Sequence, residues 1–429
     1  MNDMNKNNTV LRFMTCGSVD DGKSTLIGRL LYDTKTILTD TLSQIEKTSK
    51  KKGMTALDLS LITDGLQAER EQGITIDVAY RYFSTGSRKY IIADAPGHEQ
   101  YTRNMVTAAS TAQLAIILVD ARKGMLTQTR RHSYLTKLVG IKHFLVAVNP
   151  MDLVNYDENE YQTICDEYNS FASAIKLDQP EVTISFIPMS ALNGDMIVDR
   201  GDSLDWYKGA TLLETLENID TTEETKNSQL RFPIQLVCRP RDSANEELHD
   251  FRAFMGKIES GSLKVNDKIK VLPSSHESTI KEIRIGEELI SEANYEQSIT
   301  VSLNDEIDIS RGDMIVQKND NLTSTKNFTA NVCWLSESNL NINRTYLIMH
   351  TTRLSKAKIS SINNKININT LDAEQATELK TNDIANINFK LAQPLIVDQY
   401  AQNRSTGAFI IIDETTYHTV GAGMIETVE

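Results

Sequence analysis

A run of eight residues near the N-terminus has the types and the spacing to hold a phosphate group. It matches the pattern G-x-x-x-x-G-K-[ST], and its members are Gly17, Ser18, Val19, Asp20, Asp21, Gly22, Lys23 and Ser24. In such a run the glycines let successive backbone N–H groups surround a phosphate, and the helix that follows points its positive end at the same anion. We therefore expect Lys23 to reach the β- and γ-phosphates of a nucleotide and the Ser24 hydroxyl to ligate Mg²⁺, with Thr25 beside them in the site.

Two further stretches have the residues to sense a γ-phosphate. Thr75 lies in a Gly-Ile-Thr-Ile run, where we expect it to give Mg²⁺ a second hydroxyl when the triphosphate is bound. The D-x-x-G run comprises Asp94, Ala95, Pro96 and Gly97. Asp94 is predicted to hold Mg²⁺ through its hydration shell and the Gly97 N–H to bond the γ-phosphate, while His98 orients the attacking water. The predicted catalytic residues are thus His98, Lys23 and Thr75.

A fourth stretch can identify the base. Asn149, Pro150, Met151 and Asp152 stand where N-K-x-D is expected. Asp152 can accept hydrogen bonds from the guanine N1–H and N2 amine, which adenine does not present in the same way, so the pattern favours GTP over ATP. A backbone N–H of the run Ser190, Ala191 and Leu192 is available for the guanine O6. Proline replaces the usual lysine at position 150, and we predict that guanine selectivity is retained with weaker affinity.

The elements needed to position these runs follow from the pattern of apolar residues. Short apolar strands alternate with helical stretches from residue 11 to about residue 220, which indicates an α/β domain with a mostly parallel sheet and helices on both faces. Strands are predicted at residues 11–16, 90–93, 114–119, 143–148 and 183–187, and helices at 24–32, 100–111 and 127–138. Ligands of such sheets bind at the carboxyl ends of the strands, where the phosphate run, the D-x-x-G run and the two base-reading runs fall.

The pattern of apolar residues changes after a purely polar stretch at residues 221–227. Short alternating strands then follow one another, separated by Gly, Asn, Asp and Ser turns and without intervening helices. This spacing predicts two all-β barrels. We place the nucleotide domain at residues 1–222 and the barrels at residues 228–318 and 325–429.

Composition narrows the classes of function. The chain has 429 residues and a formal net charge of −13, which argues against a general affinity for nucleic acid or for an anionic membrane. The longest apolar run is far too short to cross a bilayer, and residues 1–10 do not resemble a signal peptide. The four cysteines lie far apart and form no C-x-x-C pair. We therefore expect a cytoplasmic protein that contacts neither a membrane nor nucleic acid.

Four longer stretches carry a resemblance to a known family. With five motifs in order and two barrels after them, the chain resembles the translation-factor GTPases of the elongation factor Tu group. Residues 16–24, 94–112, 251–272 and 403–425 are more closely similar to the large, GTP-hydrolysing subunits of bacterial sulfate adenylyltransferase. Elongation factor Tu has histidine at the position of Asp21, so the narrower resemblance is the stronger one.

That resemblance implies a regulatory GTPase subunit in sulfate assimilation. Its GTP hydrolysis, with GTP and Mg²⁺ as cofactors, would drive formation of adenosine 5′-phosphosulfate and pyrophosphate from ATP and sulfate. The family's smaller catalytic subunit would be its partner in a hetero-oligomer and would bind most of the ATP and sulfate. Two alternatives remain: a tRNA-carrying translation factor, which predicts stimulation by ribosomes, and a stand-alone regulatory GTPase, for which the barrels would be dispensable.

Overall fold

The chain folds as two compact units, residues 1–221 and residues 222–367 with 372–429. The computed structural model describes residues 10–18, 21–37, 39–51, 57–62, 77–97, 101–220, 229–239, 251–367, 370 and 372–428. The predicted polar linker at residues 221–227 lies outside the described residues.

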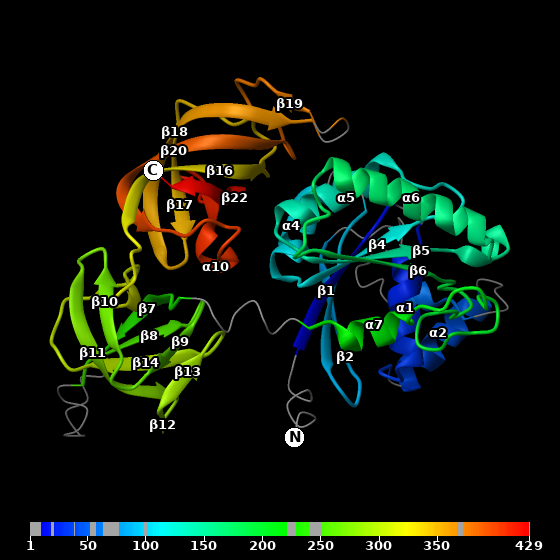
Figure 1. Ribbon diagram of the computed structural model, residues 1–429, viewed down its shortest axis with the longest axis horizontal. Helices are drawn as coiled ribbons and strands as arrows, with labels where there is room; N and C mark the ends of the chain where they lie inside the picture. The colour runs from blue at the N-terminus through cyan, green and yellow to red at the C-terminus, as the bar shows by residue number, and fades with distance from the viewer. Residues whose placement is uncertain are drawn as a thin grey trace. The chain divides into compact units, whose positions relative to one another are not determined.

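The first unit is built on a six-stranded sheet with the order β2-β3-β1-β4-β5-β6 (Figure 1). Only β2 runs antiparallel to its neighbour; the other pairs are parallel. The strands are β1 (Val10–Cys16), β2 (Ala79–Ser84), β3 (Lys89–Asp94), β4 (Leu114–Val119), β5 (His143–Val148) and β6 (Thr183–Pro188). All six residues of β4 are buried, as expected of a central strand covered on both faces.

Helices cover both faces of this sheet. Figure 1 shows α4, α5 and α6 on one face and α1, α2 and α7 on the other. Their bounds, with two 3₁₀ turns, are α1 (Lys23–Asp33), α2 (Thr39–Lys51), η2 (Leu59–Ile62), α4 (Thr102–Thr111), α5 (Thr127–Leu138), η4 (Met151–Val154), α6 (Glu158–Ala174) and α7 (Leu212–Asn218). The start of α7 is fixed by a capping box in which the Thr211 hydroxyl accepts from the Glu214 N–H and the Glu214 carboxylate accepts from the Thr211 N–H.

The order of the strands brings the predicted site together. Parallel strands expose their carboxyl ends at one edge of the sheet, and β1, β3, β5 and β6 each end there. The phosphate run follows β1, the D-x-x-G run follows β3, and the two base-reading runs follow β5 and β6. Segments up to about 170 residues apart in the chain therefore meet at one edge.

The second unit contains two closed barrels. The first has the order β10-β15-β7-β8-β14-β11-β12 and is closed by pairing of β10 with β11. Its strands, with the pair β9 and β13, are β7 (Phe232–Cys238), β8 (Ala253–Lys257), β9 (Ser262–Lys264), β10 (Lys268–Leu272), β11 (His276–Ile285), β12 (Glu288–Ile290), β13 (Glu292–Asn294), β14 (Ser298–Leu303) and β15 (Met314–Gln317).

The second barrel has the order β17-β21-β22-β16-β20-β18-β19 and is closed by pairing of β17 with β18. Its elements are β16 (Ser324–Trp334), β17 (Thr345–His350), β18 (Arg353–Ile366), β19 (Ala373–Glu374), β20 (Ile384–Ile396), α10 (Arg404–Gly407), β21 (Ala408–Asp413) and β22 (Thr419–Val428). Closure pairs the backbone groups that an open sheet would leave free at its edges.

A buried ion cluster joins the two barrels. Arg231, just before β7, forms a bidentate pair with Asp398 of the second barrel, with N–O distances of 2.8 and 2.9 Å. Its Nη1 donates to Asp320, in the segment between the barrels, at 2.6 Å. Thr406 also donates its hydroxyl to Asp398 at 2.5 Å. Because the three charged side chains are at most 9% exposed, the cluster is shielded from solvent.

The predicted fold class is confirmed, and the predicted strands of the first unit agree with β1 and β3 to β6 to within a residue. The predicted helix at 127–138 matches α5. Among the described strands of six or more residues, four were not predicted: β2, β14, β18 and β22. In β18 the polar Ser355 is buried, and two register shifts against β20 interrupt the alternation on which the prediction depended.

Candidate nucleotide-binding site

The phosphate loop is closed on itself by its lysine. Lys23 Nζ donates to the carbonyl oxygens of Gly17 and Ser18 at 3.1 and 2.6 Å, and its side chain is buried. Gly22 adopts a left-handed conformation with φ 89° directly before α1. A Cβ atom there would lie 2.6 Å from Nδ2 of Asn149, so glycine is required both by its φ angle and by the space available. The ammonium and the first turn of α1 thus face the same loop, as phosphate binding requires.

Asp21 is a buried carboxyl group within this loop. Its Oδ2 accepts a hydrogen bond from the Ser18 N–H at 2.5 Å, while Oδ1 is buried without a hydrogen-bond partner. Burial raises the pKa of Asp21 to about 6, against the opposing effect of the nearby Lys23 charge. The carboxyl group therefore titrates close to neutral pH.

The D-x-x-G run lies against the phosphate loop. A Cβ on Gly97 would come within 2.8 Å of both the Gly17 carbonyl oxygen and Lys23 Nζ, so the backbone approaches the loop as closely as glycine allows. Asp94 is 2% exposed, and its Oδ1 accepts the Thr15 hydroxyl at 3.1 Å. The oxygens of Asp94 and Ser24 are the hard ligands that Mg²⁺ prefers, so the described part of the donor set fits this ion.

Asn149 connects the phosphate loop to the base-reading loop, which is the loop after β6 that carries Ser190, Ala191 and Leu192. Its Nδ2 donates to the Asp21 carbonyl oxygen at 3.0 Å, and its Oδ1 accepts the Ala191 N–H at 2.8 Å. Both bonds are buried. The sequence identified Asn149 as part of the base-reading motif but did not reveal this bridge, because neither partner is near it in the chain.

Asp152 is oriented by the next loop of the site. Its Oδ1 accepts the Ser190 hydroxyl at 2.6 Å, and the Ser190 oxygen in turn accepts the Asn193 N–H. Asp152 remains partly exposed, as a group that binds a base must be. Met151 is fully buried, and the Asn149–Pro150 peptide bond is cis.

Four of the predicted site residues, Val19, Asp20, Thr75 and His98, lie outside the described residues. The others are brought to one edge of the sheet. Ala95, Pro96 and Ala191 are buried beside the loops, Thr25 is partly buried on α1, and Leu192 is 55% exposed.

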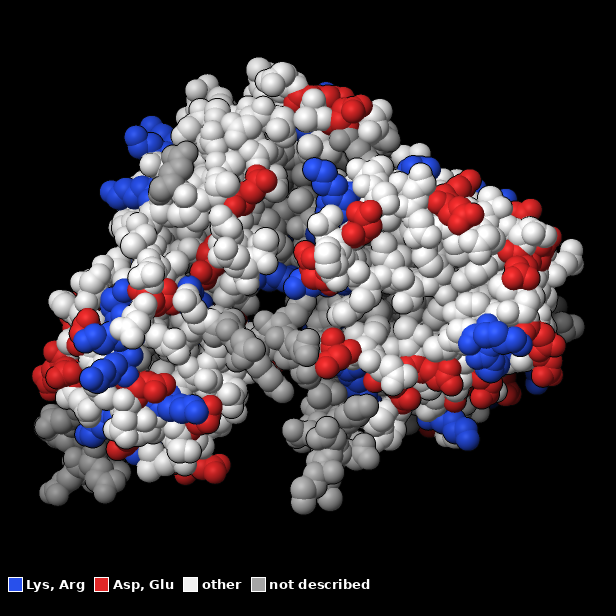
Figure 2. Space-filling view, viewed as in Figure 1, with Lys and Arg blue, Asp and Glu red and all other residues white. Residues whose placement is uncertain are grey.

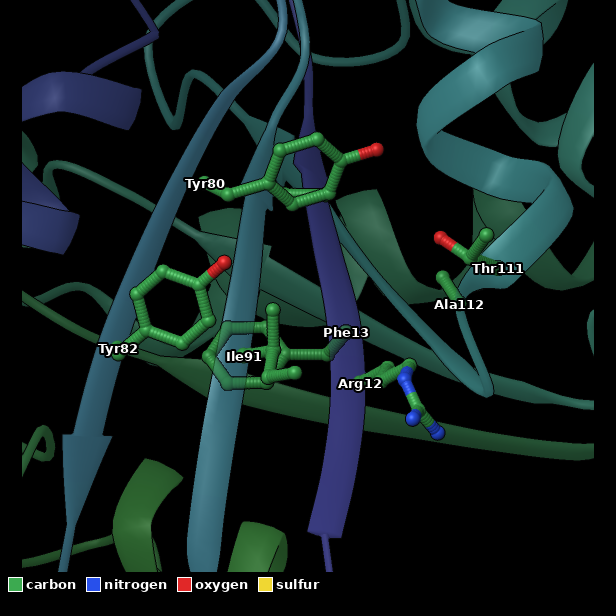
Figure 3. A pocket seen from close by; sticks show the side chains of 8 residues that line it. Arg12, Phe13, Tyr80, Tyr82, Ile91, Thr111 and Ala112 are labelled. Carbon is green, nitrogen blue, oxygen red and sulfur yellow. The ribbon is translucent and has the colours of Figure 1, made fainter. Parts of the chain in front are cut away.

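The first unit also has a concave surface apart from the loops predicted to bind the nucleotide (Figure 3). Tyr80 and Tyr82 extend from β2 beside Ile91 of β3, and Arg12 and Thr111 lie across from them. Tyr82 is 66% exposed. None of the residues predicted to bind the nucleotide lines this surface.

Charges of both signs are interspersed on the face seen in Figure 2, without a continuous basic tract among the described residues of that face. No described helix combines the length and apolar character needed to cross a bilayer. The described residues also contain no cluster of three or more His, Cys, Asp or Glu side chains arranged to hold a metal.

The chain is similar to known proteins over most of its length. Residues 8–223 match the family described as elongation factor Tu GTP binding domain, and residues 327–426 match the GTP-eEF1A C-terminal domain-like family. The chain is 50% identical to sulfate adenylyltransferase subunit 1 of Colwellia psychrerythraea, over 98% of this chain and 88% of the relative. It is 51% identical to the protein of the same name from Aliarcobacter butzleri, with the same two coverages.

Proposed function

Since the chain belongs to the sulfate adenylyltransferase subunit 1 family of elongation factor Tu-like GTPases, we propose that its GTP hydrolysis drives adenylyl transfer on a smaller catalytic partner. The products of that transfer are adenosine 5′-phosphosulfate and pyrophosphate, made from ATP and sulfate held mainly by the partner. The observation that carries the proposal is the Asn149 bridge, since it joins a phosphate loop and a base-reading loop into one nucleotide site.

Each described loop has a separate task in this proposal. Lys23 leaves its carbonyl partners to neutralise the β- and γ-phosphates, and α1 adds its positive end. Asp152 reads N1–H and the N2 amine of guanine. Because the Ala191 N–H is already bound to Asn149, the adjacent N–H of Leu192 is the better donor for O6.

The proposed ligands of Mg²⁺ are Ser24, Thr75 and Asp94. The ion would neutralise charge that develops on the β- and γ-phosphates. Thr75 and His98 complete the proposed machinery, as the γ-phosphate sensor and the group that orients the attacking water. Lys23 is the proposed catalytic cation.

The energetic coupling is conformational. Hydrolysis of GTP can favour the partner's reaction only if the GTP state binds the partner's transition state differently from the GDP state. Gly97, which touches the phosphate loop, is a described element through which loss of the γ-phosphate would be communicated. We propose the barrels as the lever or the docking surface, and the cytoplasm as the site of action.

An Asp152→Asn variant tests the base assignment. Asparagine cannot accept both guanine hydrogen bonds, and loss of one charge-assisted bond, about 1.5–3 kcal/mol, weakens GDP binding roughly ten- to 10²-fold. The new amide can donate to the C2 carbonyl of xanthine, so xanthosine diphosphate should bind the variant more tightly than it binds the natural protein. Asp202→Asn, at an exposed position of the same unit, is the control. Unchanged GDP affinity in Asp152→Asn would contradict the assignment.

The partner is tested separately by measuring GTP turnover. We expect stimulation by the purified small subunit with ATP and sulfate, and none by ribosomes. Stimulation by ribosomes alone would instead support a translation factor. Turnover that neither addition changes would support a stand-alone GTPase.

A further inference from the structure

One charged side chain outside the recognised motifs is hydrogen-bonded to two backbone carbonyls of the base-reading loop. Arg29, on α1, donates from Nε to the Ala191 carbonyl oxygen at 3.2 Å and from Nη2 to the Leu192 carbonyl oxygen. The two acceptors are 162 and 163 residues away in the chain. The helix that begins at the phosphate loop is thereby tied to the loop that follows β6.

The Arg29 side chain packs beside Gly194 of this loop and is enclosed by neighbours on its other sides. Gly194 has φ 94°, and a Cβ there would lie 3.6–3.7 Å from three atoms of the Arg29 side chain. On its other sides Arg29 contacts Asp33, with an N–O distance of 3.7 Å, and the Tyr32 ring, with its Cζ 5.9 Å from the ring centroid. The Arg29 side chain is only 19% exposed. A planar, permanently charged fork held in this way can fix two neighbouring carbonyls at once.

Because Arg29 fixes the orientation of the Ala191 carbonyl, it also fixes the orientation of the next backbone N–H, that of Leu192. The carbonyl of Ala191 and the N–H of Leu192 belong to the same peptide unit, which is planar and trans. In a trans unit the two groups point in opposite directions, so Arg29 determines where the Leu192 N–H points. The preceding Ala191 N–H is held by Asn149. The Leu192 N–H is therefore directed away from Arg29 and stays available for a ligand.

We propose that Arg29 is a positioning residue for base specificity, which orients the Leu192 N–H toward O6 of the bound guanine without touching the nucleotide. This inference rests on the proposed function, in which the site binds a guanine nucleotide. It adds a determinant of selectivity that belongs to α1 and is absent from the base-reading motifs. The same helix then carries both phosphate-binding groups and the support for base recognition.

The test compares two ligands that differ at one atom. GDP and 6-thioguanosine diphosphate share N1–H and the N2 amine, but sulfur at position 6 is a poor hydrogen-bond acceptor. In Arg29→Met we expect GDP to bind about three- to tenfold more weakly, the range set by one neutral hydrogen bond, and the thio analogue to change by less than about twofold. The preference for GDP over the analogue shrinks accordingly.

A matched control exists in the same unit. Arg200 also donates to two backbone carbonyls, those of Gly209 and Tyr207, at 2.7 and 2.6 Å. Arg200→Met should leave the ratio of the two affinities unchanged. Arg29→Lys keeps the charge but loses the planar fork, so it should shift the ratio of the two affinities in the same direction as Arg29→Met. If Arg29→Met does not fold, Arg29→Lys provides the test in its place.

Three results are distinguishable. Equal weakening of GDP and the thio analogue in both Arg29 variants would show that Arg29 only supports the loop, and would overturn the inference. An unchanged ratio together with unchanged affinities would overturn it as well. If the natural protein itself does not prefer GDP to ADP, the proposed function fails, whatever the Arg29 variants do.

Discussion

Replacing Arg231 by methionine should destabilise the barrel unit selectively. The change leaves two carboxylates without their cation, those of Asp320 and Asp398, whose side chains are only 3% and 9% exposed. Removing one member of a buried ion pair costs about 3–5 kcal/mol, because the remaining charge stays buried and unpaired. For a unit of this size each kcal/mol lowers the Tm by about 2–4 °C. The expected decrease is therefore roughly 6–20 °C.

Differential scanning calorimetry of the full chain with and without GDP separates the two units. GDP stabilises only the unit that binds it, so the transition that GDP does not shift is assigned to the barrels. Arg231→Met should lower that transition and leave GDP affinity unchanged. Arg284→Met is the matched control, since Arg284 pairs with Glu282 at 3.0 Å while both side chains are 34% exposed. Such an exposed pair contributes at most about 1 kcal/mol.

Two outcomes would refute this reasoning. One is an effect of Arg231→Met no larger than that of Arg284→Met, which would mean that solvent or another group compensates the two carboxylates. The other is a lower Tm for the nucleotide unit alone. Arg231→Lys should fall between the natural protein and the methionine variant, because lysine keeps the charge but cannot form the bidentate pair with Asp398.

Three further changes concern the nucleotide unit. Burial raises the pKa of Asp21 from 3.8 to about 6, so the folded chain binds that proton more tightly than the unfolded chain does. The free energy of unfolding therefore decreases by about 3 kcal/mol as the pH rises from 3.8 through about 6. Asp21→Asn should remove this loss, so urea unfolding should show a larger gain for the variant at pH 7.5 than at pH 5; equal gains would contradict the burial argument. Gly97→Ala places a methyl group 2.8 Å from Lys23 Nζ, so GTP turnover should fall at least tenfold while the Tm changes little, and normal turnover would exclude the proposed contact. Pro150→Lys should tighten GDP binding, measured by calorimetric titration, and equal affinities would show that proline serves as well as lysine.

The order of the motifs and the class of the fold were accessible from local sequence. The phosphate run needs only its glycines, its lysine and a following helix, all within a short segment. Strands such as β4 and β5 are continuous apolar runs bounded by polar residues, so their ends could be predicted to the residue. Strands such as β18 could not, because Ser355 is buried there, Leu354 is 42% exposed, and two register shifts against β20 interrupt the alternation. Pro150 was recognisable as a departure from the motif, but its cis peptide bond was not.

Contacts between distant segments were decided by the tertiary structure. Asn149 reaches Asp21, 128 residues away, and Arg231 reaches Asp398, 167 residues away. Such pairs depend on strand order, register and the path of each loop, so an asparagine or arginine in the sequence does not indicate its partner. The contacts of Arg29 could not be predicted for the same reason. In the sequence it is an ordinary charged residue of a helix, and only the packing of the loop after β6 against α1 brings two carbonyl oxygens within reach of its guanidinium group. The sequence by itself predicted which groups bind a guanine nucleotide, and the fold decided which distant side chains hold those groups in place.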